Sequence, residues 1–597
     1  MCGISGCVDF QNDAGRYAEA FDGVLAAMRR RGPDESGRFL SKRAALLHSR
    51  LSVIDPEHGK QPMSEGRYTL TYNGELYNAD DLRRELSAPG RSFTSRSDTE
   101  VLLKSYIQWG EGCLDKLNGI YAFAVWDGER LFLARDRMGV KPLFYTLSRG
   151  ALLFASELKT LLAYPGVKPV IDREGAAELF LLGPGRTPGR TALKGINELK
   201  AGQCAVFDES GLKIRDYWRL KAAPHTDSFE DTKERVRWLA GDAIKRQTVS
   251  DVPLCSFLSG GLDSSAIAAI SGVSRTFSVD YRDNARYFKA GKFQPDSDAA
   301  YVKIMSDFLG TEHTYVELDT EELIDALFEA AEARDLPGMA DVDSSLLLFC
   351  REVKRSATVA LSGECADELF GGYPWYRDEN VLWQDSFPWA KSPEYRAGFA
   401  RRGLFGGLDT AAYVRERYEG TVNGAEGLET DSPLERRMRQ MFMLNIEWFM
   451  QTLLDRKDRC SMHSGLEVRV PFCDHRIAEY LYNTPWEFKN HKGREKGLLR
   501  EALSGLLPDE VLWRKKSPYP KTWNPAYTRR VSEMLGDLLG SPNEPLFELA
   551  DRDALRSLLT AEGDTPWYGQ LMTVPQTMAY FLQMNHWLKA RKIYFSA

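Results

Sequence analysis

Several features that would assign this chain to other classes of protein are missing from its 597 residues. No stretch approaches the roughly 18 consecutive apolar residues of a membrane span, and no basic segment followed by an apolar one marks a secretory leader. The chain has 78 Lys and Arg against 85 Asp and Glu, so it lacks the basic excess of nucleic-acid binders. We therefore expect neither a membrane nor a nucleic acid as a partner.

Paired cysteines and the common nucleotide-binding signature are also missing. The nine cysteines are scattered without a Cys-x-x-Cys pair, which argues against the usual zinc sites and against a disulfide framework. Isolated thiols are typical of a reducing compartment, so we expect a cytoplasmic protein. Gly-x-x-x-x-Gly-Lys-Ser/Thr does not occur, which excludes a Walker-type NTPase.

The order of the predicted elements divides the chain into two parts. Short β segments between turn signals fill the first part, which predicts an α+β domain with antiparallel sheets. A stretch rich in Gly and Pro at 181–203 indicates an extended connector. From about residue 229, strand–helix–strand spacing predicts a parallel sheet, followed by a mostly helical tail. We expect domains at 2–215 and 225–597.

The first six residues, MCGISG, allow two interpretations of Cys2. A free cysteine packs like a small apolar residue, so Cys2 fits the start of a buried strand. Alternatively, removal of Met1 leaves a nucleophilic thiol and a free amine on one residue. The amine titrates near ~8 and the thiol near ~8.5, so exchange of a proton between them is easy. These six residues alone leave both interpretations open.

The segment SFLSGGLDSS at 256–265 carries the strongest motif. It follows an apolar run of strand length and precedes a helical pattern, so its glycines and free helix N–H groups can approach a phosphate. Asp263 would repel a phosphate alone, but it suits a Mg²⁺ ion that bridges carboxylate and phosphate oxygens. A plain glycine turn with Asp and Ser as helix caps is the alternative.

A second strand-end motif, LSGECADELFGGY at 361–373, places three acids within five residues. Asp367 could supply a second carboxylate to the metal ion. The alternative is a solvated helix start, because acids are favoured at helix N-termini.

Together these features make the chain resemble the glutamine-dependent asparagine synthetases along nearly its whole length. The Ser-Gly-Gly-x-Asp-Ser loop is similar to the pyrophosphate loop of ATP pyrophosphatases. Further matching segments are RKDRCSMHSGLEVRVPFCD (456–474), GREKGLLRE (493–501) and RKKSPYPKTWNP (514–525). The resemblance implies an N-terminal-nucleophile hydrolase sandwich (αββα) that acts as a class II glutamine amidotransferase. An α/β parallel-sheet ATP-pyrophosphatase domain, adenine nucleotide α-hydrolase-like, follows it and ends in a helical part.

The reaction that the resemblance implies uses glutamine, aspartate and ATP. Cys2 would hydrolyse glutamine, with its own amine as base, and ammonia would pass through an interior channel to an aspartyl adenylate. Asparagine, AMP and pyrophosphate would result. Asn73 and Gly74 would form the oxyanion hole. The implied glutamine pocket comprises Arg50, Leu51, Ser52, Val53, Ile54, Asn73, Gly74, Glu75 and Asp98, in which Arg50 and Asp98 would hold the α-carboxylate and the α-amine.

In the second domain, the resemblance implies a site for ATP and Mg²⁺. Glu364 would serve the adenylate step and accept a proton from the incoming ammonium, and Lys496 would stabilise charge on the phosphate. An exposed helical lysine is an equal alternative for Lys496. The metal ligands would be Asp263 and Asp367. The implied ATP-binding residues are Leu258, Ser259, Gly260, Gly261, Asp263, Ser264, Ser265, Val279, Ser362 and Gly363. Relatives are commonly dimers, which implies a homodimer.

Three departures from the family pattern bear on the acceptor. Arg30 stands at a histidine position, and Cys365 replaces a glycine beside Glu364. The acidic segment with Asp341 and Asp343 lacks an expected arginine, so it either meets the acceptor's amine or lies outside the pocket. Another carboxylate acceptor, such as diaminopimelate or a secondary metabolite, therefore stays open. A cyclising enzyme like β-lactam synthetase need not keep the N-terminal nucleophile, so the presence of Cys2 argues against it. A non-catalytic role would predict damaged site residues, which the chain does not have.

Overall fold

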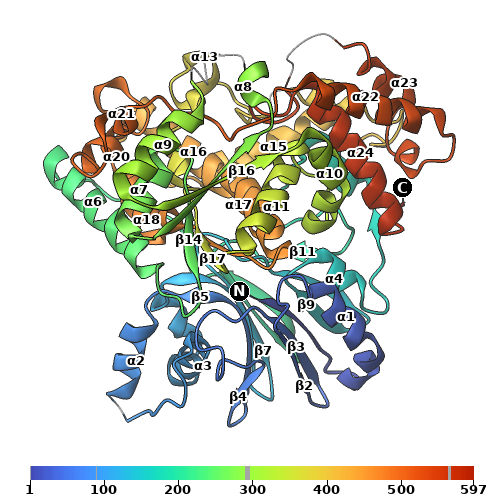
Figure 1. The fold of residues 1–597 in the computed structure, drawn as a ribbon. Helices are drawn as coiled ribbons and strands as arrows, with labels where there is room; N and C mark the ends of the chain where they lie inside the picture. Colours follow the sequence, from blue (N-terminus) through green and yellow to red (C-terminus); the bar gives the residue numbers. More distant parts are fainter. Residues whose placement is uncertain (1, 89, 289–295, 391, 562–565, 597) are drawn as a thin grey trace.

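The computed structural model describes residues 2–88, 90–288, 296–390, 392–561 and 566–596. The chain folds into two halves, with two stacked antiparallel sheets in the N-terminal half and a parallel sheet in the C-terminal half (Figure 1). The first antiparallel sheet contains, in spatial order, β11 (Asn197–Glu198), β8 (Phe144–Ser148), β9 (Ala151–Ala155), β1 (Gly3–Val8), β3 (Ala44–Arg50) and β2 (Glu35–Leu40). The second contains β13 (Gly211–Asp216), β12 (Gln203–Asp208), β7 (Leu131–Arg135), β6 (Gly119–Trp126), β5 (Tyr68–Leu76) and β4 (Met63–Glu65).

The N-terminal half has four layers. Alanine, leucine and isoleucine side chains such as Ile4, Leu46 and Leu133 fill the space between the two sheets. Helices α1 (Phe21–Met28) and α4 (Leu158–Leu162) cover the outer face of the first sheet, and α2 (Ala79–Ser87) and α3 (Asp98–Trp109) cover the second. Because both faces of β6 are covered, seven of its eight residues are buried and its sequence lacks polar alternation. The predicted αββα sandwich is confirmed.

The C-terminal half contains the predicted parallel sheet with helices on both faces. Its strands, in spatial order, are β16 (Glu312–Leu318), β15 (Arg275–Tyr281), β14 (Leu254–Phe257), β17 (Val359–Leu361) and β18 (Glu467–Arg469). Helices α6 (Phe229–Arg246), α7 (Leu262–Ser271) and α9 (Asp298–Leu309) pack on one face, and α10 (Thr320–Arg334), α11 (Asp341–Lys354) and α17 (Met450–His463) on the other. The chain leaves β14 for β15 on one side and reaches β17 on the other side. A crevice at the carboxyl ends of such strands is a usual ligand site.

Later helices complete the C-terminal half. They include α15 (Thr410–Gly424), α16 (Pro433–Leu444), α18 (His475–Asn483), α22 (Pro525–Gly540) and α24 (Val574–Ala590). Near the end of the chain, β19 (Tyr594–Phe595) pairs in parallel with β10 (Val170–Ile171). No helix within the described ranges is both long and apolar enough to cross a membrane.

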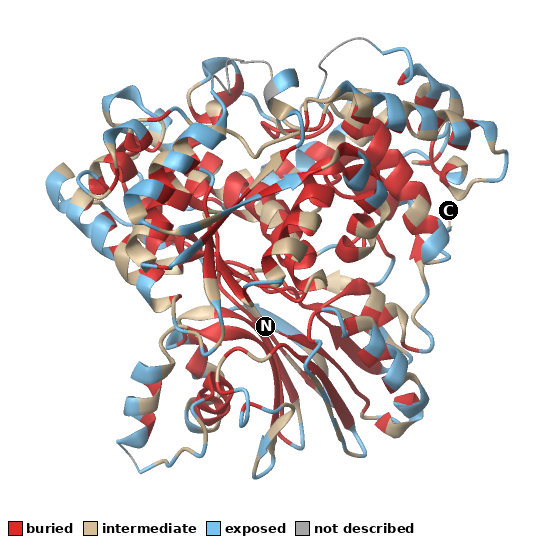
Figure 2. Ribbon diagram, viewed as in Figure 1, coloured by how far each residue is buried: buried red, intermediate tan, exposed pale blue. Residues whose placement is uncertain are grey.

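The expectation of an extended connector at 181–203 is wrong. The buried guanidinium of Arg396 donates to the carbonyl oxygens of Phe180 (3.0 Å) and Gly183, and β11 joins the first sheet. These contacts satisfy the polar backbone of a segment rich in Gly and Pro, so the segment is packed between the halves. Figure 2 shows buried residues along the strands of both halves, whereas exposed residues lie on outer surfaces such as that of α6.

Candidate active sites

Cys2 lies inside the protein, immediately before β1 and near the boundary between the halves (Figure 1). It is 6% exposed. Its backbone N–H donates to Oδ1 of Asn73 (3.0 Å), and its Sγ lies 4.0 Å from the carbonyl oxygen of Leu51. Burial raises the pKa of the Cys2 thiol, so attack by this sulfur requires a nearby base. The residue is buried, as the packing interpretation expects, and its polar atoms also meet two of the predicted glutamine-binding residues.

Strand β5 brings the two predicted oxyanion-hole residues to Cys2. Asn73 is buried, and its Nδ2 has no hydrogen-bond partner in the described part of the chain. Such unpaired buried donors are rare and call for an explanation. At Gly74, strand β6 approaches so closely that a Cβ atom would lie 2.1 Å from the carbonyl oxygen of Ile120. In the sequence Asn-Gly, the asparagine therefore supplies an unpaired side-chain donor, and the glycine allows the close contact between β5 and β6.

The predicted glutamine-binding segment 50–54 forms the loop that follows β3. The guanidinium of Arg50 is buried and pairs with Glu35 (2.8 Å). The backbone N–H of Asp251, from the C-terminal half, donates to the carbonyl oxygen of Val53 (3.1 Å). The loop is therefore held by both halves of the protein.

The two predicted acidic residues of the glutamine pocket have different surroundings. Asp98 accepts a hydrogen bond from the Tyr72 hydroxyl (3.0 Å), and burial raises the pKa of Asp98. Glu75 instead faces the C-terminal half, where its Oε2 lies 3.6 Å from the guanidinium of Arg469. Burial, followed by the charge of Glu467, raises the pKa of Glu75 well above its ordinary value. Asp98 thus belongs to the surroundings of β5, and Glu75 belongs to the contact between the halves.

A buried ion cluster connects the Cys2 region with α17. The Nε of Arg31 donates to the carbonyl oxygen of Cys2 (3.0 Å), and the same guanidinium pairs with Asp458 on α17 (2.7 Å). Lys141 pairs with the second oxygen of Asp458 (2.8 Å). Arg30, the departure from the family pattern, is exposed. The buried contact is made by the next residue, so the departure does not alter it.

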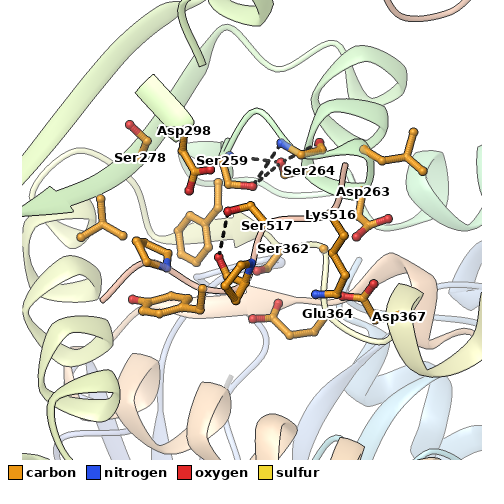
Figure 3. Close-up of a pocket in the computed structure, with 18 of the residues that line it drawn as sticks. Ser259, Asp263, Ser264, Ser278, Asp298, Ser362, Glu364, Asp367, Lys516 and Ser517 are labelled. Carbon is orange, nitrogen blue, oxygen red and sulfur yellow. Dashed lines mark hydrogen bonds and ion pairs between the residues drawn. The ribbon is translucent and has the colours of Figure 1, made fainter. Parts of the chain in front are cut away.

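The second candidate site is a cavity of about 550 Å³ at the carboxyl ends of β14 and β17. This volume suits a small-molecule ligand. In Figure 3, Ser259 and Ser264 form the upper wall, Asp263 and Asp367 lie to the right, and Glu364 lies below. The hydroxyl groups of Ser259 and Ser264 are 3.0 Å apart. The predicted ATP-binding residues that line the cavity are Leu258, Ser259, Gly261, Asp263, Ser264, Val279, Ser362 and Gly363.

The other two predicted ATP-binding residues, Gly260 and Ser265, support the loop from behind. Gly260 has a φ of +67°, and a Cβ atom there would lie 2.6 Å from Cβ of Tyr301. Both the left-handed backbone and the close helix require glycine. Ser265 is fully buried in α7. Arg514 holds the loop from the other side, because its guanidinium donates to the carbonyl oxygen of Ser259 (3.3 Å).

Two carboxylates and two lysines form the right-hand wall of the cavity. The ammonium group of Lys496 lies 2.7 Å from Asp263 and 2.9 Å from Asp367, and Lys516 lies 3.0 Å from Asp367. Burial raises the pKa of Asp263. Burial acts on Asp367 in the same direction, but its two lysine partners outweigh it and lower that pKa. Lys496 is buried, so the alternative of an exposed helical lysine is wrong.

The pair Asp263 and Asp367 fits a Mg²⁺ ion. Within the described residues no group of three or more His, Cys, Asp and Glu is arranged to hold a metal. Mg²⁺ is commonly held by one or two carboxylates together with substrate phosphates, and it prefers oxygen ligands. The ammonium group of Lys496 lies between the two carboxylates, so the pair is already arranged around one positive charge.

Glu364, at the lower wall, has a basic partner that the sequence analysis did not predict. Its Oε1 lies 2.7 Å from the ammonium group of Lys457 on α17, and its Oε2 has no hydrogen-bond partner among the described residues. Burial alone would raise the pKa of Glu364, but Lys457 outweighs burial, and the pKa lies below its ordinary value. Glu364 is therefore held as a carboxylate, the form that can accept a proton.

The two remaining departures differ in their relation to the cavity. Cys365 lines the cavity with a φ of +77°, which a side chain rarely adopts, and its thiol contacts Cys473. The acidic segment lines the cavity through apolar residues such as Met339 and Leu346, but its two acids do not: Asp343 is buried and pairs with Arg334 (3.2 Å). Of the two roles left open for these acids, the structure favours the one outside the pocket.

Six cationic residues that line the cavity were missed in the sequence, although the segments that contain them were recognised. They are Arg456, Lys457, Arg500, Arg514, Lys515 and Lys516. All but Arg500 lie in a run of charged residues, RKDR or RKKS, that is indistinguishable by pattern from a solvated surface. Only the packing of α17 and of the segment after Trp513 turns these side chains inward.

Comparisons with known proteins match both halves of the chain. A family model described as "Asparagine synthase" matches residues 235–589, and one described as "Glutamine amidotransferase domain" matches residues 1–218. Asparagine synthetase (glutamine-hydrolyzing) 3 of Bacillus subtilis strain 168 is 49% identical over 611 residues, covering 99% of both chains. Asparagine synthetase (glutamine-hydrolyzing) 1 of the same organism is 31% identical over 82% of both chains. Asparagine synthetase B of Escherichia coli K12 is 29% identical, over 87% of this chain and 82% of its own.

Proposed function

The chain belongs to the glutamine-hydrolysing asparagine synthetase family, and on this premise we propose that it is an ATP-dependent carbon–nitrogen ligase that makes asparagine. Glutamine is hydrolysed at Cys2, and the ammonia released reacts with an aspartyl adenylate in the C-terminal cavity. The products are asparagine, glutamate, AMP and pyrophosphate. The observation that carries the proposal is the presence of two separate sites, a buried N-terminal cysteine and a serine–glycine loop with two carboxylates, in one chain.

The first reaction is the hydrolysis of the glutamine side-chain amide. After loss of Met1, the amine of Cys2 removes the thiol proton, and the sulfur attacks the amide carbon. Asn73 Nδ2, a buried donor without a partner in the described chain, stabilises the negative oxygen of the tetrahedral intermediate. Its Oδ1 meanwhile holds the Cys2 nitrogen. Collapse of the intermediate releases ammonia and leaves a thioester, which water hydrolyses to glutamate.

The second reaction is the transfer of AMP to the β-carboxylate of aspartate. The free N–H groups at the start of α7, with Ser259 and Ser264, bind the phosphates. Lys496 and Lys516 stabilise negative charge as pyrophosphate departs. Asp263 and Asp367 would hold Mg²⁺, which when bound neutralises phosphate charge. Glu364, kept ionised by Lys457, accepts a proton from the nitrogen that attacks the adenylate.

Helix α17 supports the idea that the two sites work together. Its Asp458 pairs with Arg31, which donates to the carbonyl oxygen of Cys2, and its neighbour Lys457 pairs with Glu364. Two adjacent residues of one helix thus contact the surroundings of both reactions. Ammonia that stays inside the protein along this boundary remains unprotonated, whereas most ammonia in neutral water is ammonium and cannot attack.

The test of the proposed function is a product assay. The purified protein is incubated with ATP, Mg²⁺, glutamine and aspartate, and pyrophosphate, AMP and asparagine are measured. We expect the three in equal amounts. Pyrophosphate that appears only when another carboxylic acid replaces aspartate would reassign the acceptor, and no pyrophosphate with any acceptor would refute the ligase assignment.

Location and assembly belong to the same proposal. All nine cysteines lie in the described residues and are free thiols, which supports a reducing cytoplasm. A homodimer stays a prediction, and the molecular mass in solution tests it.

A further inference from the structure

One arginine in the synthetase cavity forms no ion pair with the described residues. Arg456 lies on α17, lines the cavity and is 4% exposed. Its Nε has no hydrogen-bond partner, and within the described ranges no carboxylate pairs with its guanidinium. Its guanidinium lies over the ring of Tyr519, whose centre is 5.1 Å from the guanidinium carbon. A charge removed from water without a partner is unfavourable, so this arrangement indicates a missing anion.

The acidic residues near Arg456 are engaged elsewhere. On the same helix, Asp455 pairs with Arg334 (3.0 Å) and Asp458 pairs with Arg31 (2.7 Å). Glu364, which also lines the cavity, lies 2.7 Å from Lys457. Glu364 has one oxygen without a hydrogen-bond partner, and the charge of Arg456 contributes to lowering the pKa of Glu364, but no ion pair joins the two side chains in the described chain. The guanidinium of Arg456 is therefore free to pair with the anion of a ligand.

Arg456 and the lysines that pair with the two carboxylates come from different segments of the cavity lining. Phe449, Leu453, Arg456 and Lys457 all line the cavity, and their spacing of three or four residues puts them on one face of the helix. Phe449 packs against Trp375 (5.2 Å between ring centres). The lysines that pair with Asp263 and Asp367 lie instead at residues 496 and 516. This face, which starts at Phe449 just before α17, forms one wall of the cavity, apolar at Phe449 and Leu453 and cationic at Arg456 and Lys457.

We propose that Arg456 binds the α-carboxylate of the acceptor amino acid and so selects aspartate. This inference rests on the proposed function. The planar guanidinium fork matches a carboxylate through two parallel hydrogen bonds. The β-carboxylate of the same molecule must reach the nucleotide, so the α-carboxylate is the group left to meet a cation on the α17 wall of the cavity. Arg456 supplies the arginine that is missing from the segment around Asp341 and Asp343.

The experiment compares the wild type with Arg456→Met and Arg456→Lys. Ammonium serves as nitrogen source, so that the Cys2 site plays no part, and pyrophosphate release is measured against aspartate and against ATP. We expect Arg456→Met to raise the KM for aspartate about 10- to 100-fold, the value of one charge-assisted pair. The KM for ATP should change less than about twofold, because ATP meets other residues. Arg456→Lys keeps the positive charge but loses the planar fork, so its KM for aspartate should lie between those of the wild type and Arg456→Met.

A stability measurement separates ligand binding from a structural role. Because the charge lacks a partner in the described chain, Arg456→Met should unfold at the same temperature as the wild type or at a higher one. It should also lose the thermal shift that aspartate produces in the presence of ATP and Mg²⁺. β-Alanine is aspartate without the α-carboxylate. Its inhibition constant against aspartate should therefore be high, and it should be the same in the wild type and in Arg456→Met. Arg355→Met, an exposed substitution on the surface, is the matched control.

The outcomes are distinct. A rise in the KM for ATP with an unchanged KM for aspartate would show that Arg456 binds a phosphate and would overturn the inference. A fall in unfolding temperature with parallel loss of all activities would show a structural role and would also overturn it. A wild type that makes no asparagine at all would refute the proposed function instead.

Discussion

The ion pair between Lys457 and Glu364 gives a prediction whose size follows from the structure. Both side chains are buried, with 6% and 15% of their surface exposed, and the charged atoms are 2.7 Å apart. Removing one partner of a buried pair commonly destabilises the other by about 3–5 kcal/mol. One pKa unit corresponds to about 1.36 kcal/mol, so Lys457→Met should raise the pKa of Glu364 by about two to four units. Glu364 would then take up a proton at a higher pH than in the wild type.

The assay is the pH profile of ammonium-dependent asparagine synthesis. A proton acceptor must be ionised, so the acidic limb of the profile should move toward higher pH in Lys457→Met, while glutaminase activity stays unchanged. Lys303→Met, which removes an exposed ion pair with Asp307, is the matched control and should not move the limb. Superimposable profiles of Lys457→Met and the wild type would refute the idea that Lys457 keeps Glu364 ionised.

The same substitution changes how stability depends on pH. In the wild type the pKa of Glu364 is lowered, so the residue contributes stability above the unfolded carboxyl pKa of ~4.3 and loses it as the pH falls. In Lys457→Met the pKa is raised, so ionisation opposes folding as the pH rises. The unfolding temperature of the variant should therefore lie further below that of the wild type at about pH 8 than at about pH 5.5.

Three further predictions concern the two sites separately. Asn73→Ala should lower glutamine hydrolysis about 10²- to 10³-fold, the effect of losing one oxyanion donor, with ammonium-dependent synthesis unchanged; equal rates of hydrolysis would remove Asn73 from the oxyanion hole. Gly260→Ala forces a side chain into a left-handed backbone 2.6 Å from Tyr301, so kcat/KM for ATP should fall about 5- to 30-fold, which corresponds to about 1–2 kcal/mol. In Gly261→Ala the new Cβ atom would meet only a serine hydroxyl at 3.3 Å, so kcat/KM for ATP should fall less than in Gly260→Ala. A larger fall in Gly261→Ala would contradict the loop geometry. Asp263→Asn should abolish pyrophosphate release but keep glutamine hydrolysis, and normal release would exclude Asp263 from metal binding.

Much of the architecture was predictable because local patterns and burial agree. The buried strand ending at Phe257, the glycine pair and the helix from Leu262 follow one another in the sequence as they do in the structure. In β6 both faces are covered, which an uninterrupted apolar run already indicates. The segment 181–203 misled the prediction, because its turn residues are satisfied by a buried arginine more than 200 residues away.

Parts of the candidate sites could not be read from sequence because they depend on packing between distant segments. Lys457 and Lys496 resemble surface lysines in any local pattern, and only the fold brings them to Glu364 and to Asp263. Glu75 follows Asn73 and Gly74 directly, yet it turns toward Arg469 of the other half. A motif therefore identified the reaction class, whereas the direction of each charged side chain required the structure.

The central claim is that a buried N-terminal thiol supplies nitrogen to a separate ligase site. The most direct measurement compares asparagine synthesis by Cys2→Ala with glutamine and with ammonium as nitrogen source. We predict that synthesis from glutamine disappears while synthesis from ammonium keeps the wild-type rate. Equal loss with both nitrogen sources, or continued synthesis from glutamine, would contradict the account.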